Sequence, residues 1–176
     1  MIRLYLHKGK ISWLKQPALK LIQVGTDSPY FHVDAEYDKR FFIGATAERG
    51  VDVRQKKWLY ESGHDIDIFE CLAPIDEEKF YDLMASREGG KYDLKGVFYL
   101  GWLKISGQRD KANKWQKGND YFCSEFVMSC LLDSVKEPNW FQDIPENDIA
   151  SPADIARSRS FKLSDSIEKQ DQKSPV

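Results

Sequence analysis

The sequence predicts an α+β domain in which an antiparallel sheet packs against helices. Short segments in the first half of the chain alternate apolar and polar residues, whereas longer segments in the second half space their apolar residues as helices do. The length is also informative, because 176 residues with 41% hydrophobic content suit one domain with a sizeable core.

Strands are expected mainly in the first half. The pattern predicts them at residues 2–6, 30–37, 41–47, 51–53 and 65–72. Only a short polar turn separates the second of these segments from the third. These two segments are therefore expected to pair as a hairpin.

Helices are expected at residues 12–24, 76–87, 94–103 and 122–132. A last short helix should begin after Ser151, which suits the N-cap, with Pro152 in the first turn. The polar segment 107–119 is predicted to be a loop. Because the composition is polar from residue 160 onward, the domain is assigned to residues 1–159 and a flexible tail to residues 160–176.

Charge and cysteine content argue against several classes of protein. The 26 basic and 28 acidic residues give a net charge of −2, so no overall attraction to nucleic acid or to an anionic membrane is expected. The chain has 3 cysteines, too few and too oddly numbered for a disulfide framework, and no spacing suits zinc. Phosphate-binding loops are also missing from the sequence, so neither a cofactor nor a metal is predicted.

No signal peptide or membrane-spanning run is visible in the sequence. This predicts a protein without a transmembrane segment that is cytoplasmic, or phage-encoded and virion-associated. The sequence makes no prediction of oligomeric state.

Cys123 is the candidate nucleophile. It lies where a polar loop gives way to an apolar helix, and the positive end of a helix dipole favours a reactive thiolate. The alternative is a buried structural cysteine, which is the commonest fate of a free thiol. Cys71 and Cys130 are predicted to be core residues.

His32 is the candidate base, because a cysteine nucleophile needs a group that takes its proton. Of the 3 histidines, only His32 lies inside a predicted strand with polar neighbours on its own face. His7 lies in a basic segment near the start of the chain, and His64 lies in a predicted surface turn. The alternative for His32 is a half-exposed strand histidine.

The hairpin suggests a third group. A three-residue turn sets Ala35 opposite Ile43 and collects the apolar side chains on one face, as a half-buried sheet requires. The same register sets His32 opposite Thr46, which is therefore predicted to orient the imidazole ring. A two-residue slip would bring Glu48 opposite His32 instead.

Several motifs in a fixed order resemble a known family. They are residues 28–33 (SPYFHV), 41–46 (FFIGAT), 50–54 (GVDVR), 90–93 (GKYD), 122–127 (FCSEFV) and 151–154 (SPAD). Together they resemble the circularly permuted, papain-like branch of the NlpC cell-wall peptidase superfamily (YiiX-like proteins). In that branch the histidine precedes the cysteine, as His32 precedes Cys123 here.

The resemblance implies a permuted papain-like fold and a cysteine peptidase or amidase that works through an acyl-enzyme on Cys123. The backbone N–H of Cys123 is expected to help hold the oxyanion. Tyr92, Tyr121 and Asp34 are expected near the substrate. The leading substrate is an amide of a small peptide or peptidoglycan fragment. The alternatives are a thioesterase or acyltransferase on a lipid-like acylated substrate, and an inactive binding module of the same fold.

One position departs from the family pattern. Relatives often have a glutamate near Gly44 as the third catalytic group, and glycine cannot take that role. The role therefore moves to Thr46, with Glu48 and Asp34 as alternatives, or the site is a Cys–His dyad or a weakened enzyme.

Overall fold

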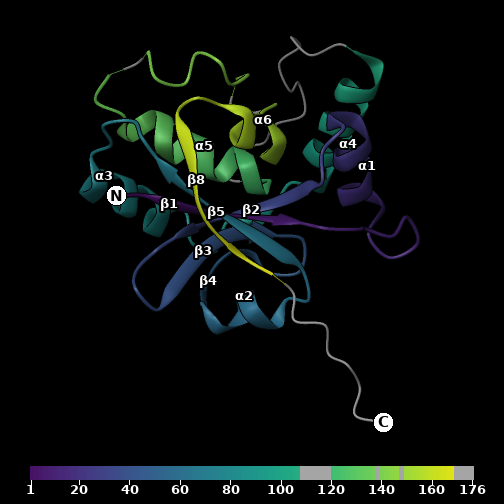
Figure 1. Ribbon diagram of the computed structural model, residues 1–176, viewed down its shortest axis with the longest axis horizontal. Helices are drawn as coiled ribbons and strands as arrows, with labels where there is room; N and C mark the ends of the chain where they lie inside the picture. The colour runs from purple at the N-terminus through teal and green to yellow at the C-terminus, as the bar shows by residue number, and fades with distance from the viewer. Residues whose placement is uncertain (108–119, 138, 147–148, 169–176) are drawn as a thin grey trace.

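The computed structural model describes residues 1–107, 120–137, 139–146 and 149–168 of the chain. An antiparallel sheet of six strands runs through the molecule in the order β4-β3-β2-β1-β5-β8 (Figure 1). The strands are β1 (Arg3–Lys8), β2 (Tyr30–Glu36), β3 (Phe41–Thr46), β4 (Gly50–Gln55), β5 (Asp65–Cys71) and β8 (Phe161–Ile167). The predicted α+β class with an antiparallel sheet is confirmed.

Helices lie on both sides of this sheet. They are α1 (Pro17–Thr26), α2 (Lys57–Glu61), α3 (Glu77–Ser86), α4 (Leu94–Ser106), α5 (Cys123–Ser134) and α6 (Pro152–Arg157). Figure 1 shows α3, α5 and α6 over one face, α2 under the other, and α1 beside α4. A short parallel pair, β6 (Lys91–Tyr92) and β7 (Asp120–Tyr121), leads into α4 and α5. Within the described ranges, no helix is long and apolar enough to cross a membrane.

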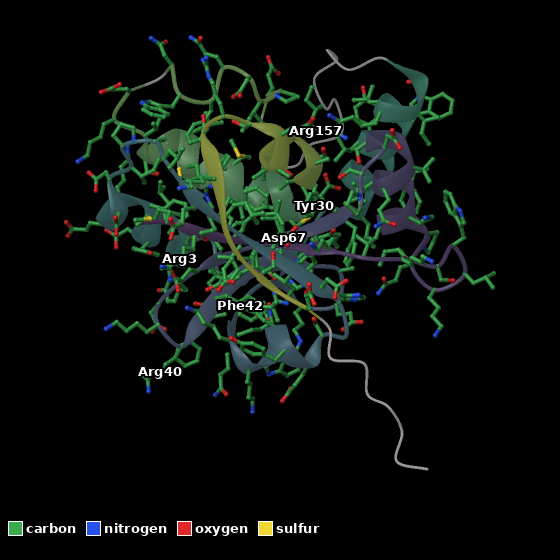
Figure 2. All side chains as sticks on the ribbon, viewed as in Figure 1. Arg3, Tyr30, Arg40, Phe42, Asp67 and Arg157 are labelled. Carbon is green, nitrogen blue, oxygen red and sulfur yellow. The ribbon has the colours of Figure 1, made fainter. Side chains whose placement is uncertain are left out.

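The main core lies between the sheet and helices α3 and α5, where residues such as Leu6, Val33, Phe80 and Phe126 are buried. A smaller cluster under α2 joins Phe42 to Leu59, and Figure 2 shows the labelled Phe42 on the α2 side of the sheet. Because both faces of the sheet are covered, polar side chains of β1 and β2 on the α2 side are also buried.

The predicted strands are all present, and most helices begin near the expected residues. The helix expected over residues 12–24 begins only at Pro17, since proline suits the first turn of a helix. The last helix has the predicted cap: the Ser151 side chain accepts a hydrogen bond from the Asp154 N–H. Residues 108–119 of the predicted loop lie outside the described residues. The short helix α2 was not expected from the sequence.

The prediction of a flexible tail from residue 160 is wrong for its first half. Residues 161–167 form strand β8, which pairs with β5. Phe161 stacks on Phe141 with ring centroids 5.8 Å apart, and the Ser166 hydroxyl donates to Asp67 at 2.6 Å. The polar composition misled the prediction because an edge strand leaves most of its side chains in solvent. Residues 169–176 lie outside the described residues.

Candidate active site

Cys123 is the first residue of helix α5. Phe122 precedes it in an extended conformation, and its backbone N–H donates to the Glu125 carboxylate at 3.2 Å. This bond satisfies one of the amide donors at the start of the helix. The Cys123 and Cys130 side chains are fully buried in the main core, and that of Cys71 is almost fully buried there. The helix therefore holds the Cys123 sulfur at its positive end.

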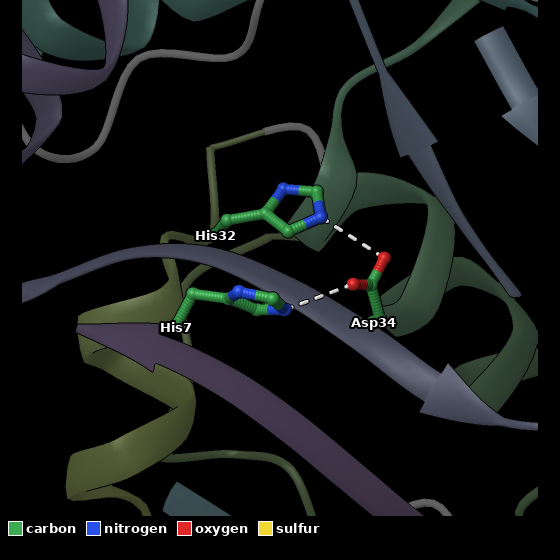
Figure 3. Close-up of side chains that lie close together, drawn as sticks. All are labelled: His7, His32 and Asp34. Atoms are coloured by element: carbon green, nitrogen blue, oxygen red, sulfur yellow. Dashed lines mark hydrogen bonds and ion pairs between the residues drawn. The ribbon is translucent and has the colours of Figure 1, made fainter. Parts of the chain in front are cut away.

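His32 lies on β2 and is almost completely buried. Its Nε2 donates a hydrogen bond of 2.9 Å to Oδ1 of Asp34, two residues along the same strand. Residues two apart in a strand point to the same face, so the ring and the carboxylate lie side by side. Figure 3 shows this contact. Because Nε2 binds Asp34, Nδ1 is the ring nitrogen that remains to form a hydrogen bond with Cys123.

Asp34 is the centre of a buried hydrogen-bond network. Its Oδ2 accepts a bond of 3.0 Å from Nε2 of His7 on β1, and Figure 3 shows both imidazole rings reaching the one carboxylate. Its Oδ1 also accepts a bond of 2.8 Å from the Arg54 guanidinium on β4. Burial by itself raises the pKa of Asp34, but the charges of His32 and Arg54 and the hydrogen bonds hold it well below its usual range. Asp34 is therefore a carboxylate despite its burial.

The electrostatics of the two histidines differ. Burial lowers the pKa of His32, but the charges of Asp34 and Cys123, and hydrogen bonds with both, outweigh it and raise the pKa to about 10. His32 therefore carries a proton at neutral pH. Burial lowers the pKa of His7 despite its bond to Asp34, so His7 is a neutral hydrogen-bond donor.

Thr46 does not orient His32, so the first choice for the third group is wrong. Its hydroxyl is buried and has no hydrogen-bond partner among the described residues. The predicted hairpin register is correct where Ala35 pairs with Ile43, but the cross-strand partner of His32 is His7 on β1. The paired part of β2 and β3 ends before it reaches His32, so Thr46 does not come opposite the ring.

Asp34, an alternative for this role and a predicted substrate contact, is instead the residue that binds His32. Gly44 explains how the carboxylate fits. A Cβ atom on Gly44 would lie 1.7 Å from Oδ1 of Asp34, far inside van der Waals contact. The glycine therefore leaves the space that the Asp34 carboxylate occupies.

A cavity of about 520 Å³ opens beside His32. Its wall is largely apolar and aromatic, with Phe31, Trp58, Leu94 and Phe98 among its residues. The cationic side chains of Lys15, Arg49 and Arg54 and the carboxylate of Glu48 also line it. An extended apolar group with one polar end suits such a cavity.

Of the two tyrosines expected near the substrate, only Tyr92 lines this cavity. Burial, followed by the charge of Cys123, raises the pKa of Tyr92 well above its usual value, and its hydroxyl is a hydrogen-bond partner of Cys123. The ring centroids of Tyr121 and Phe126 are 6.1 Å apart, and Tyr121 lines a separate cavity with Arg87. The cavity beside His32 therefore does not support the expected substrate contact of Tyr121.

The sequence did not point to His7, Arg54 or His64 as parts of the site. All three line the cavity, and the His7 and His32 rings are 5.1 Å apart. His7 lies just beyond the strand expected at residues 2–6, and its contact with His32 depends on pairing between strands whose order was unknown. In the sequence, Arg54 is visible only as a cation directly after the strand expected at residues 51–53.

Ligand atoms of His7, His32 and Asp34 lie within 4.8 Å of one another, a spacing that a metal ion could use. Both histidine nitrogens are already directed at the two oxygens of Asp34. The guanidinium of Arg54 contacts the same carboxylate and repels a further cation. These residues therefore form a network that positions His32, a poor setting for a metal.

No protein-family model matches the sequence, and no curated protein matches it at a significant level. A buried cysteine at a helix start, a protonated histidine beside it and a carboxylate behind the histidine are the parts that nucleophilic catalysis uses.

Proposed function

We propose that this protein is a cysteine hydrolase that forms an acyl-enzyme on Cys123. His32 is its acid–base group, and Asp34 is the positioning residue that orients the ring. The observation that carries the proposal is the pair of interactions that His32 makes: one ring nitrogen binds Asp34, and Cys123 raises the pKa of the same ring. A protonated imidazole beside a cysteine favours the thiolate, which is the reactive form of the nucleophile.

The reaction follows from this charge state. The Cys123 thiolate attacks the carbonyl carbon and forms an S–C bond, while the backbone N–H of Cys123 stabilises the oxyanion. The bond to the leaving group breaks, and the leaving group takes the proton of His32. Water then gives a proton to His32 and attacks the thioester, which releases a carboxylic acid and restores the thiolate. Asp34 stays ionised throughout and stabilises the imidazolium.

We also propose the permuted papain-like arrangement for the fold. Motifs that lie far apart in the sequence supply the site: residues 28–33 bring His32, 41–46 bring Gly44, and 90–93 bring Tyr92. The motif at residues 122–127 supplies the nucleophile, and its Ser124 hydroxyl donates to the Ala150 carbonyl just before the last motif, at 2.7 Å. This gathering supports the resemblance to YiiX-like proteins.

The cavity favours a substrate with an apolar acyl group joined by an ester, thioester or amide bond. Phe31, Trp58 and Phe98 offer aromatic contact area, and such area binds apolar chains by burial. A second candidate is the amide of a peptidoglycan stem peptide. Lys15 and Arg49 at the cavity favour that substrate, since each can pair with a peptide carboxylate.

A matched pair of substrates and variants tests the proposal. We expect the protein to hydrolyse medium-chain acyl esters of p-nitrophenol or thiocholine faster than acetyl esters, and Cys123→Ala to remove this activity. Cys71→Ala is the control, because it deletes a buried thiol outside the site. Activity retained by Cys123→Ala would overturn the covalent mechanism. Cleavage of γ-linked stem peptides without acyl ester cleavage would select the second candidate.

A further inference from the structure

An exposed apolar stripe runs along helix α4. Leu94, Phe98, Trp102 and Ile105 follow at intervals of three or four residues, so they share one side of the helix. Their exposed fractions are 48%, 49%, 63% and 50%. Apolar side chains of this size are stabilised by burial. Because these four stay exposed, they contribute little to the core of the chain itself.

The opposite side of α4 is buried inside the molecule. Val97, Leu100 and Leu103 are buried against Ile22 of α1. The two helices approach closely, because a Cβ atom on Gly101 would lie 2.5 Å from the Leu21 side chain. The contact with α1 therefore uses the inward side of α4 and leaves the outward side chains of α4 exposed.

The segment before α1 also carries exposed apolar side chains. Trp13 is 52% exposed and Leu14 is 96% exposed. The following residues, among them Lys15, line the cavity beside His32 together with Leu94 and Phe98 of the stripe. The apolar surface and the cavity are therefore continuous at Leu94 and Phe98. We name this surface the α1/α4 face, made of Trp13, Leu14, Leu94, Phe98, Trp102 and Ile105.

The two segments that carry the α1/α4 face are basic. Residues 8–26 and 94–107 contain no aspartate or glutamate and carry the lysines Lys8, Lys10, Lys15, Lys20, Lys95 and Lys104. Lys8 pairs with Asp67 and Lys104 pairs with Asp154. For the other four lysines, no ion pair is formed within the described ranges. The net charge of −2 thus conceals an excess of positive charge in the segments that carry this face.

We propose that the α1/α4 face docks on an anionic phospholipid bilayer. Tryptophan, phenylalanine and leucine side chains insert at the boundary between headgroups and acyl chains, while the lysines meet the anionic headgroups. The mouth of the cavity then opens at the membrane surface, because Leu94 and Phe98 belong to both. An acyl chain can pass from the bilayer into the cavity beside His32 without crossing water. This last step alone depends on the proposed hydrolase function.

Vesicle binding tests the docking separately from catalysis. The protein is prepared as Cys123→Ala, so that lipid is not consumed, and is sedimented with vesicles of phosphatidylcholine with or without phosphatidylglycerol. We expect binding to the anionic vesicles that weakens as salt increases. In the same background, Trp102→Ser with Ile105→Ser should lower the partition coefficient by more than about tenfold, since both side chains insert.

Charge reversal tests the basic part of the face. Each lysine near an anionic surface contributes roughly a fivefold increase in partitioning, so Lys95→Glu should lower it by at least that factor. Leu163→Ser is the matched control, because Leu163 is 51% exposed but lies on β8. It should leave binding unchanged. Circular dichroism and retained hydrolysis of a short soluble ester, each measured with Cys123 present, verify that the variants fold.

Three outcomes would overturn the docking. They are no binding to anionic vesicles, equal binding by the Trp102→Ser and Ile105→Ser variant, and a dimer that depends on Trp102 and does not bind vesicles. The dimer would mean that a second copy covers the α1/α4 face. Soluble ester cleavage without vesicle binding would reject the docking and leave the proposed hydrolase in place. Vesicle binding without ester cleavage would support the docking and reject the proposed hydrolase.

Discussion

At the scale of the residue, the site depends on one buried carboxylate. Asp34 accepts hydrogen bonds from His7, His32 and Arg54, and its side chain is completely buried. A buried carboxylate is stable only when it is paired in this way. The pairing also makes Asp34 a strong source of negative charge for His32, which a neutral threonine hydroxyl is not.

The first prediction concerns Asp34→Asn. The amide keeps the shape but removes the charge, so the imidazolium loses its partner and the activity should fall on the order of 10²- to 10⁴-fold. Thr46→Val is the control, and it should be nearly silent because the Thr46 hydroxyl has no partner among the described residues. Steady-state kcat/KM on an acyl ester measures both. A crippled Thr46→Val beside an active Asp34→Asn would reverse the assignment.

The second prediction concerns Gly44→Ala. The new methyl group meets the Asp34 carboxylate, so the carboxylate must move, at a cost of about 1–3 kcal/mol in the free energy of unfolding and with loss of activity. A double-mutant cycle with Asp34→Ala separates this clash from other effects, since the clash disappears when the carboxylate is absent. Equal destabilisation by Gly44→Ala in both backgrounds would show that Asp34 is not the obstacle.

The third prediction concerns pH. The folded-state pKa of His32, about 10, lies above its ordinary value of 6.5. The stability from this shift is therefore fully present below about pH 6.5 and is lost as the pH rises through about 10. The ¹⁵N shifts of His32, followed by NMR, should report titration near the upper value and a lower one in Cys123→Ala, where one of the two charge partners is missing. An identical His32 titration in Cys123→Ala would show that Cys123 does not raise the pKa of His32.

At the scale of the element, alternation predicted the strands and the pairing of Ala35 with Ile43, because a half-buried sheet fixes the register. It could not predict where that pairing stops. The β2–β3 pairing ends before His32, whose cross-strand partner is His7 on β1, and the order of these strands is set by the whole fold. Strand β8 was missed for a related reason, since an edge strand with exposed polar side chains lacks the alternation of a half-buried one.

The fourth prediction tests strand β8 with two substitutions. Phe161 is almost fully buried, so Phe161→Ala should lower the free energy of unfolding by about 3 kcal/mol. Leu163→Ala, at an exposed position of the same strand, should change it by no more than about 0.5 kcal/mol. Urea unfolding measures both. Equal, small effects would mean that residues 161–167 behave as the flexible tail that their composition suggested.

At the scale of the whole molecule, the sheet and helix α5 bring together residues that are far apart in the sequence. His32 and Cys123 could be proposed from sequence because their local settings, a strand with polar neighbours and a helix start, are visible in the chain. The cavity, the contact with His7 and the α1/α4 face could not, because each arises where separate segments of the chain meet in the fold.

The central claim is a covalent acyl-enzyme on Cys123. The other two thiols are a built-in control, because burial raises the pKa of Cys71 and of Cys130 to about 11 and keeps both protonated at neutral pH. The most direct test is acid quenching during turnover of a slow acyl ester, followed by intact mass measurement and peptide mapping. We expect one acyl group per chain, on the peptide that contains Cys123, and none in Cys123→Ala. Turnover without an adduct, or an adduct on any other residue, would contradict the account.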